Sequence, residues 1–182
     1  MVEQMLESLC NAYDLNACCL RYFNAAGADL AGGIGEAHDP ETHLIPNVLR
    51  SLLGDGDVLK VFGNDYAPHH GTCVRDYVHV NDLAQAHLLA LEFLDEEAGF
   101  KAFNLGNGSG YSVLDIVNVC SDVAGCEIEY EVAPRRRGDP ATLVADCSKA
   151  IYELGWTPEF GSLADIISSA WLWHRTEKRV IC

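Results

Sequence analysis

A short apolar run at residues 17–23, with the sequence ACCLRYF, most constrains what this chain can fold into. Nearly every position is apolar or aromatic, so the run does not alternate as a strand with one wet face does. Such a run is typical of a strand in a parallel sheet that helices cover on both faces. A pattern of helical period precedes it over residues 2–15, and a loop rich in Gly and Ala follows over residues 24–40. This order indicates an α/β protein with a long loop at the end of a buried strand, and loops of this length are usually functional or disordered.

Helices and strands alternate over the rest of the chain. We predict that Thr42, either Asn81 or Asp82, and Ser112 cap three helices, because short polar side chains accept the unpaired N–H groups at helix starts. Pro46 fits the first turn of the first of these helices. The predicted helices run over residues 42–53, 81–94, 112–124, 148–154 and 162–177, and the predicted strands over residues 58–62, 102–105 and 127–132.

The composition excludes several classes of function. A net charge of −15 argues against a broad basic surface for nucleic acid, and no apolar run approaches the ~18–20 residues of a membrane span. The first ten residues carry acids where a signal peptide needs positive charge. The eight cysteines include an adjacent pair and no Cys-x-x-Cys. We therefore expect free thiols in a reducing cytoplasm rather than a disulfide framework.

The segment from Arg21 to Asn24 lies where the buried strand passes into the loop. Ligands bind at the carboxyl ends of strands in open α/β sheets, so this position is informative. Tyr22 and Phe23 can lie against a flat cofactor ring, and the Asn24 amide can donate to a phosphate oxygen. The segment alone leaves open the alternative of two core aromatics followed by a turn-forming Asn.

Two further segments place arginine in unusual surroundings. Arg75 stands in the β-like stretch VRDYVHV at residues 74–80, where a guanidinium can bind a phosphate through two hydrogen bonds. The alternative for Arg75 is a structural pair with Asp76 or a Glu. Residues 135–139 (RRRGD) concentrate three of the twelve basic residues in one loop, which indicates an anion or several carboxylates nearby. A solvated loop that offsets surrounding acids is the alternative there.

Other motifs indicate structure rather than chemistry. Gly106, Gly108 and Gly110 follow a strand, but the spacing is not Gly-x-Gly-x-x-Gly, so we predict a tight strand-to-helix turn. The seven histidines show no metal-binding spacing: His69 and His70 are neighbours in a loop, and His43 and His79 are isolated. We therefore predict no metal site. The sequence also shows no Ser-His-Asp elbow and no paired acid and base, so no catalytic residue is assigned.

Taken together, these segments resemble the UDP-glucose 4-epimerase family of the extended short-chain dehydrogenase/reductase superfamily. The resemblance runs essentially from Met1 to about Lys178 and is densest over residues 21–46, RYFNAAGADLAGGIGEAHDPETHLIP. Residues 61–87 are similar more loosely, because related dehydratases, decarboxylases and epimerases carry variants of them.

The resemblance assigns roles to matching positions. It implies that Tyr22 and Phe23 lie near the nicotinamide of NAD. It also implies that Asn24, Arg75 and Arg136 contact the diphosphate of a UDP-sugar.

Further substrate contacts are implied at the uridine and the sugar. Phe62 is the residue expected to stack on the uracil, and Asp139 the one expected to bond the ribose. Backbone contact at the His43–Leu44 step has a physical basis, because helix N-termini favour phosphate. The remaining substrate-binding residues expected from the resemblance are Lys60 and Val61 beside the uracil, Tyr77, and Leu143 in the sugar pocket.

The resemblance also suggests what this sequence lacks. The Gly-rich nucleotide loop and the Tyr-x-x-x-Lys pair of the family would precede Met1. We therefore expect a C-terminal part without the NAD-binding half, with NAD bound mainly by that missing half. In this scheme residues 1–23 are the remnant of a doubly wound Rossmann-type sheet. Residues 24–178 form a small α/β substrate-binding domain, from which 74–80 and 102–106 return to the sheet, and residues 179–182 are a tail.

The implied reaction is the interconversion of UDP-glucose and UDP-galactose in galactose metabolism. NAD oxidises the sugar C4 hydroxyl with a Tyr as base and a Lys that lowers its pKa, and the 4-keto sugar rotates and is reduced on its other face. The resemblance also implies a possible homodimer. Two alternatives stay open: a non-catalytic UDP-sugar-binding or interaction module, and a related sugar-nucleotide dehydratase or decarboxylase.

Overall fold

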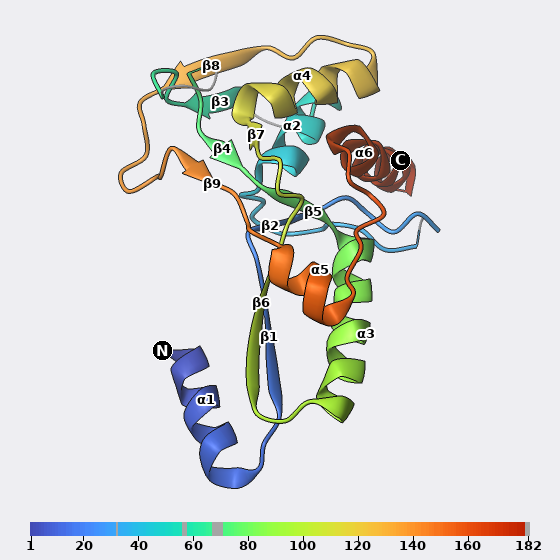
Figure 1. Ribbon diagram of the computed structural model, residues 1–182. Helices are drawn as coiled ribbons and strands as arrows, with labels where there is room; N and C mark the ends of the chain where they lie inside the picture. The colour runs from blue at the N-terminus through green and yellow to red at the C-terminus, as the bar shows by residue number, and fades with distance from the viewer. Residues whose placement is uncertain (32, 56–57, 67–70, 181–182) are drawn as a thin grey trace.

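The computed structural model describes residues 1–31, 33–55, 58–66 and 71–180, with side chains up to residue 176. Helices and strands alternate along most of the chain, which confirms the α/β class (Figure 1). The elements are α1 (Val2–Tyr13), β1 (Ala17–Tyr22), β2 (Asn24–Ala26), α2 (Leu44–Leu52), β3 (Leu59–Phe62), β4 (Val74–Arg75), β5 (Tyr77–His79), α3 (Val80–Glu96), β6 (Phe100–Leu105), β7 (Tyr111–Ser112), α4 (Val113–Ala124), β8 (Tyr130–Ala133), β9 (Thr142–Leu143), α5 (Ser148–Leu154) and α6 (Leu163–Val180).

Two pairs of parallel strands follow one another and form the framework of the molecule. Strand β1 pairs in parallel with β6, from Ala17 opposite Phe100 to Tyr22 opposite Leu105. Its continuation β2 pairs in parallel with β5. Figure 1 shows the long β1–β6 pair with α1 on one side and α3 on the other. These strands are Rossmann-like. Along β1 and β2 the chain runs from the lower end of the molecule in Figure 1 to its middle, where residues 21–27 lie.

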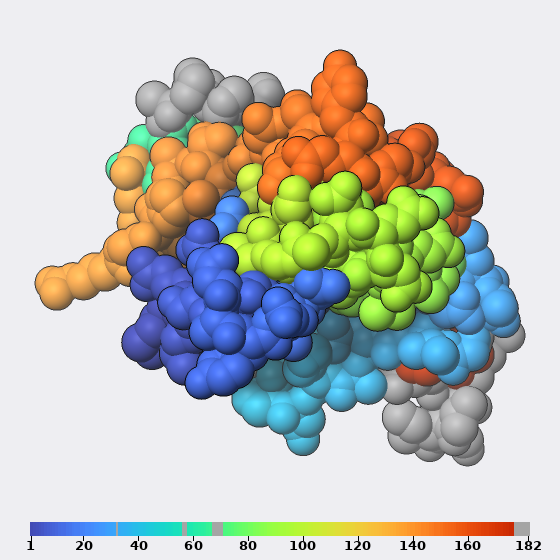
Figure 2. Space-filling view, turned by 60° about the horizontal axis from the view of Figure 1, so that its bottom comes forward, coloured from blue at the N-terminus to red at the C-terminus, as the bar shows by residue number. Residues whose placement is uncertain are grey.

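The outer side of this pair is less covered than the sequence predicts. We expected the strand at 17–23 to be buried on both faces, but β1 is only half-buried along its first four residues and exposed at Arg21 and Tyr22. The apolar face of α1 is itself exposed, with Val2, Met5 and Tyr13 more than half accessible. Figure 2 views this end of the molecule and shows α1 (dark blue) and α3 (yellow-green) on its surface.

The described residues form two apolar cores, one packed along the parallel strands and one among helices. One joins α3, β6 and α5, where Phe103 and Trp156 are fully buried. The other joins α2, α4 and α6, where Val48, Ile116 and Ile166 are fully buried. The indole of Trp156 donates to the Asp82 carbonyl at 3.0 Å, which ties the chain after α5 to α3. The space between these cores is where the loops after the strands meet.

Helix starts test the predicted caps. Ser112 caps α4 through a capping box with Asp115, as predicted. The cap predicted for α3 is wrong, because α3 begins at Val80 and the His79 ring accepts from the Asn81 N–H. Asp82 is not available as a cap, since its carboxylate accepts the N–H groups of Glu159 and Phe160. The predicted Thr42 cap is also wrong. Helix α2 begins at Leu44 with His43 as the N-cap residue, and it has no capping hydrogen bond from a side chain.

Several short strands were not predicted. Strands β2, β7 and β9 have two or three residues each, too few to show a period of two in the sequence. Strand β4 lies between β7 and β9, antiparallel to the first and parallel to the second. The strand predicted over 127–132 forms at Tyr130–Ala133, where it pairs in parallel with β3.

Across the described residues, helices long and apolar enough to cross a membrane are absent.

The carboxylate of Asp76 joins three segments at the centre of the molecule. Asp76 is 1% exposed and accepts the backbone N–H groups of Asn107 at 2.7 Å, Gly108 at 3.1 Å and Ala145 at 3.0 Å. A Cβ atom at Gly106 would overlap this carboxylate, which is why the turn begins with Gly. Gly108 and Gly110 have positive φ values, so the glycine-rich segment is the predicted turn.

Asp76→Ala should destabilise the chain by about 3 kcal/mol or more, since each buried N–H left without an acceptor costs roughly 1–3 kcal/mol. Urea denaturation followed by circular dichroism measures the change. Asp122→Ala, at an exposed position of α4, is the control and should change stability little. Equal effects of the two substitutions would contradict the central role of Asp76.

The cysteines near the end of α4 give a second test of the fold. All seven cysteines within the described residues are free. Burial raises the pKa of the Cys120 thiol to about 12, whereas Cys126 is exposed just beyond the helix. Because only the thiolate is nucleophilic, iodoacetamide should alkylate Cys126 quickly and Cys120 only after unfolding. Peptide mass spectrometry over time measures both rates, and similar rates in the native chain would show that α4 is not packed as described.

Candidate functional site

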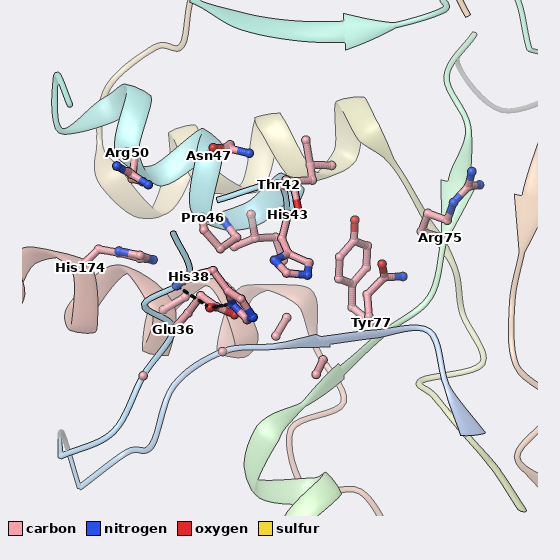
Figure 3. Close-up of a pocket in the computed structure, with 18 of the residues that line it drawn as sticks. Glu36, His38, Thr42, His43, Pro46, Asn47, Arg50, Arg75, Tyr77 and His174 are labelled. Carbon is pink, nitrogen blue, oxygen red and sulfur yellow. Dashed lines mark hydrogen bonds and ion pairs between the residues drawn. The ribbon is translucent and has the colours of Figure 1, made fainter. Parts of the chain in front are cut away.

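A large cleft opens among helices α2, α3 and α6 and the nearby strands (Figure 3). Its volume is about 1510 Å³, above the usual range of about 300–1,000 Å³ for small-molecule sites, so an extended ligand fits. Strands β2 and β3, the β4–β5 segment, and helices α2, α3 and α6 supply its walls. It therefore lies at the ends of parallel strands, where ligands bind in open α/β folds.

Most of the residues predicted for a site come together in this cleft. Nine line it: Asn24, His43, Leu44, Lys60, Phe62, Arg75, Tyr77, Arg136 and Asp139. Four do not: Tyr22, Phe23, Val61 and Leu143. Segments that lie more than a hundred residues apart in the sequence thus meet at one surface.

The structure shows where the four residues outside the cleft lie. Val61 is 1% exposed, because alternation along β3 turns it into the core and turns Lys60 outward. Tyr22 and Phe23 stand at the carboxyl end of β1, where they are 43% and 52% exposed. They are therefore accessible aromatic side chains and not the core aromatics of the alternative interpretation. Leu143 pairs with Arg75 in the β4–β9 register.

Arg75 is held in place by the residues around it. Its guanidinium donates to the Pro140 carbonyl at 2.9 Å and to the Asp139 carboxylate at 3.2 Å. The alternative partner Asp76 is excluded, because its carboxylate binds backbone N–H groups on the other side. The Arg75 side chain is 15% exposed and lines the cleft, so a partly buried cation faces the ligand space.

The three adjacent arginines have three different surroundings. Arg135 pairs with Asp65 at 2.6 Å and lies over the Tyr66 ring, so it is structural. Arg136 lies 4.0 Å from the centre of the Phe62 ring and lines the cleft. Arg137 is exposed outside the cleft lining. The solvated-loop alternative therefore fits Arg137 but not its two neighbours.

The start of α2 also faces the cleft. Helix N-termini carry unpaired N–H groups and a partial positive charge, which favour phosphate. The Glu41 carboxylate already accepts the N–H groups of Thr42 and His43, each at 2.7 Å. The N–H groups of Leu44 and Ile45 come next and lie in the cleft lining. Opposite them, Asn24 uses one amide N–H to bond the Asp76 carbonyl at 2.6 Å and has a second to offer.

The Tyr77 phenol stays protonated in this site. Burial raises the pKa of Tyr77 well above its ordinary value, and the nearby Cys73 adds to the shift. In Figure 3 its hydroxyl points into the space between His43 and Arg75. Tyr77 can therefore form hydrogen bonds with a ligand but cannot serve as a base near neutral pH.

Glu36 and His38, which were not predicted for a site, line the cleft together with the predicted His43. His43 was expected to be isolated, but its ring centre lies 5.0 Å from that of His38. Glu36 and Glu41 complete a group whose ligand atoms all lie within 4.8 Å of one another. The signal that was missed is the repeat Glu-x-His at 36–38 and 41–43. His69 and His70 lie outside the described residues.

Glu41 holds this part of the cleft in a pH-dependent way. Burial opposes its ionisation, but hydrogen bonds from the backbone and ring of His43 outweigh it and lower the pKa of the carboxyl. A lowered pKa means that Glu41 stabilises the fold above its unfolded pKa of about 4.3, and this stabilisation is lost as the pH falls through the folded value.

Glu41→Gln should therefore lower the melting temperature near neutral pH, and the difference from the unchanged chain should shrink as the pH falls below about 4. Thermal denaturation over a pH series measures the difference. Glu127→Gln, at an exposed position, is the control. A difference that is constant with pH would contradict this role of the Glu41 carboxylate.

The fold and the cleft together define an α/β protein with Rossmann-like parallel strands and an extended, partly cationic ligand cleft at their ends. The model of the NAD dependent epimerase/dehydratase family matches residues 1–106, more than half of the chain. The chain belongs to this family.

Named relatives are UDP-glucose 4-epimerases. The chain is 51% identical over 174 residues to that of Halalkalibacterium halodurans, covering 96% of this chain and 52% of the relative. It is also 51% identical over 171 residues to that of Corynebacterium glutamicum, covering 93% of this chain and 51% of the relative. The chain thus spans about half the length of the curated relatives it matches.

Solved structures agree with the fold. A crystal structure of UDP-glucose 4-epimerase superposes with a TM-score of 0.92 at 48% identity, covering 97% of this chain and 54% of the other. The UDP-glucose 4-epimerase of Bifidobacterium longum in complex with NAD+ and UDP gives 0.90 at 38% identity, covering 97% and 52%.

Two expectations from the sequence are wrong. We expected a part that lacks the NAD-binding half of the family, and NAD bound mainly by that missing half. The NAD dependent family model instead matches this chain from residue 1 to residue 106. That range contains the parallel pairs β1–β6 and β2–β5. The expectation relied on the absence of two short motifs, the Gly-rich loop and the Tyr-x-x-x-Lys pair, whereas the family model matches the range as a whole.

Proposed function

We propose that the cleft binds a UDP-hexose, either UDP-glucose or UDP-galactose, and that the chain serves their interconversion as a UDP-glucose 4-epimerase. The observation that carries this proposal is the convergence of Arg75, Arg136 and the N-terminus of α2 on one cleft. The relatives named above support the choice of substrate. The separation of residues 24–178 as the substrate-binding domain stays a prediction.

The diphosphate is the part of the ligand that the cleft suits best. Arg75 is oriented by Asp139 and Pro140, so its guanidinium needs little reordering to bond a phosphate oxygen. The N–H groups at the start of α2 and the second amide N–H of Asn24 supply neutral donors. Fixed donors of this kind reduce the entropy that binding costs.

The uridine would lie toward β3. Phe62 is half-buried and offers an aromatic face, which Arg136 covers. We propose that Arg136 turns to the diphosphate when the ligand binds and leaves the ring to the uracil, with the Lys60 side chain beside it. Asp139 would accept from the ribose hydroxyls, and Leu143 would border the hexose.

NAD is the cofactor that the family implies. When bound, it supplies the acceptance and return of hydride at the sugar C4. Tyr22 and Phe23 fit a flat ring, because both are accessible at the carboxyl end of a parallel strand. Tyr77 holds its proton, so the residues assigned here bind and orient the substrate. No catalytic residue is proposed among them.

The alternatives differ in their products. A dehydratase or decarboxylase would convert UDP-sugars to other compounds, and a binding module would leave them unchanged. Identity near 50% to proteins named UDP-glucose 4-epimerase supports the epimerase. Cytoplasmic localisation agrees with free thiols in the described residues, and a homodimer stays a prediction from the resemblance.

Arg136→Ala should weaken UDP binding at least tenfold, because a charge-assisted hydrogen bond to phosphate is lost. Isothermal titration calorimetry with UDP measures the change. Arg137→Ala is the matched control in the same loop and should leave the affinity within about twofold. Equal losses in both variants would indicate general attraction by the loop, and an absence of saturable UDP binding would remove the proposal.

A further inference from the structure

Two Glu-x-His repeats occupy the loop between β2 and α2. Glu36 contacts the His38 ring, and Glu41 contacts the His43 ring at 2.8 Å. The two rings lie 5.0 Å apart between centres, tilted by 56°. Figure 3 shows His38 and His43 close together on one wall of the cleft, with Glu36 below them. The loop thus gathers two imidazoles and two carboxylates at one point.

We propose that Glu36, His38, Glu41 and His43 form a binding site for a divalent transition-metal ion, with Zn²⁺ as the best match. Imidazole and carboxylate are both ligands of zinc, and imidazole distinguishes the site from those of Mg²⁺ or Ca²⁺, which use oxygen alone. Cu²⁺ and Ni²⁺ also accept such ligands.

The distances suit a tetrahedral ion after a small movement. Bonds of about 2.0–2.2 Å to nitrogen and oxygen place tetrahedral ligands roughly 3.3–3.6 Å apart. The ligand atoms here lie within 4.8 Å of one another, and the Glu41 and His43 atoms lie 2.8 Å apart, so the widest pairs need to close by about 1 Å while the two Glu-His contacts open to the tetrahedral spacing. The His38 and His43 side chains are 62% and 52% exposed, which leaves them room to rotate.

The charges also favour a cation. Two carboxylates converge beside the two rings. A divalent ion would offset both of these negative charges.

The backbone of the loop is fastened on both sides of the group. The Trp173 indole on α6 donates to the Glu36 carbonyl at 2.9 Å. A Cβ atom at Gly35 would overlap that indole, so the loop crosses α6 in close contact. At the other end the Glu41 side chain is 3% exposed and accepts two backbone N–H groups. A held backbone lowers the entropy lost when the ligands close on an ion.

Titration of the chain with Zn²⁺ alone, near neutral pH and without nucleotide, tests the proposal. Calorimetry should show one site per chain, and His38→Gln with His43→Gln should weaken it at least tenfold. His87→Gln is the matched control, because His87 lies on α3 outside the cleft lining and should leave the affinity unchanged. Glu36→Gln should weaken binding as well, and it leaves the start of α2 untouched. Circular dichroism checks that each variant is folded.

Co²⁺ in place of Zn²⁺ separates this site from the cysteines. The expected visible spectrum is that of a tetrahedral site without thiolate-to-metal charge transfer. Thiolate bands, or Zn²⁺ binding that the double His variant keeps, would assign the metal to cysteine and overturn the proposal. Absence of saturable Zn²⁺ binding would overturn it too. Because no nucleotide is used, failure here leaves the proposed UDP-hexose site untouched.

Discussion

The buried carboxylate of Asp76 is the interaction on which the rest of the structure depends. Asp76 is the single residue between β4 and β5, two strands that pair with different partners. Its carboxylate binds the turn after β6 and the chain after β9, and its carbonyl binds Asn24 at the end of β1. The segment that carries Asp76 is thereby joined to three others through the carboxylate and the backbone carbonyl of one residue. Because Arg75 and Tyr77 flank Asp76, the same interaction fixes two residues of the cleft.

The cleft offers cationic side chains to an anionic ligand, although the chain has a net charge of −15. Two arginines in the cleft contact protein groups that a ligand can replace. Arg75 is held by Asp139 at 3.2 Å, and Arg136 rests on the Phe62 ring. Arg75 is therefore oriented before a ligand arrives, whereas Arg136 has to turn away from the Phe62 ring, and neither is held by a short, buried ion pair. The Glu-His group adjoins the start of α2, because Glu41 accepts the N–H group of His43, the N-cap residue of that helix.

The sequence predicted the larger elements and part of the site for identifiable reasons. Helices with a strong apolar period, such as α4 with its Ser112 cap, were found within a residue or two. Arg136 and Phe62 were singled out, but only the fold could show that they contact each other. The cap of α3 was missed because Asp82 is occupied by residues near 160, a contact that no local pattern reveals. The Glu-His group was missed for a similar reason, since four residues of loop lie between the two histidines and only the course of the loop brings their rings together.

The central claim is that Arg75, Arg136 and the start of α2 form one site for the diphosphate of a UDP-hexose. A crystal structure of the chain with UDP-glucose tests it most directly. The account predicts the diphosphate between the two guanidinium groups and the N–H groups of Leu44 and Ile45, with the uracil on the Phe62 ring. Binding of UDP-glucose elsewhere, or a diphosphate that contacts neither Arg75 nor Arg136, would contradict it.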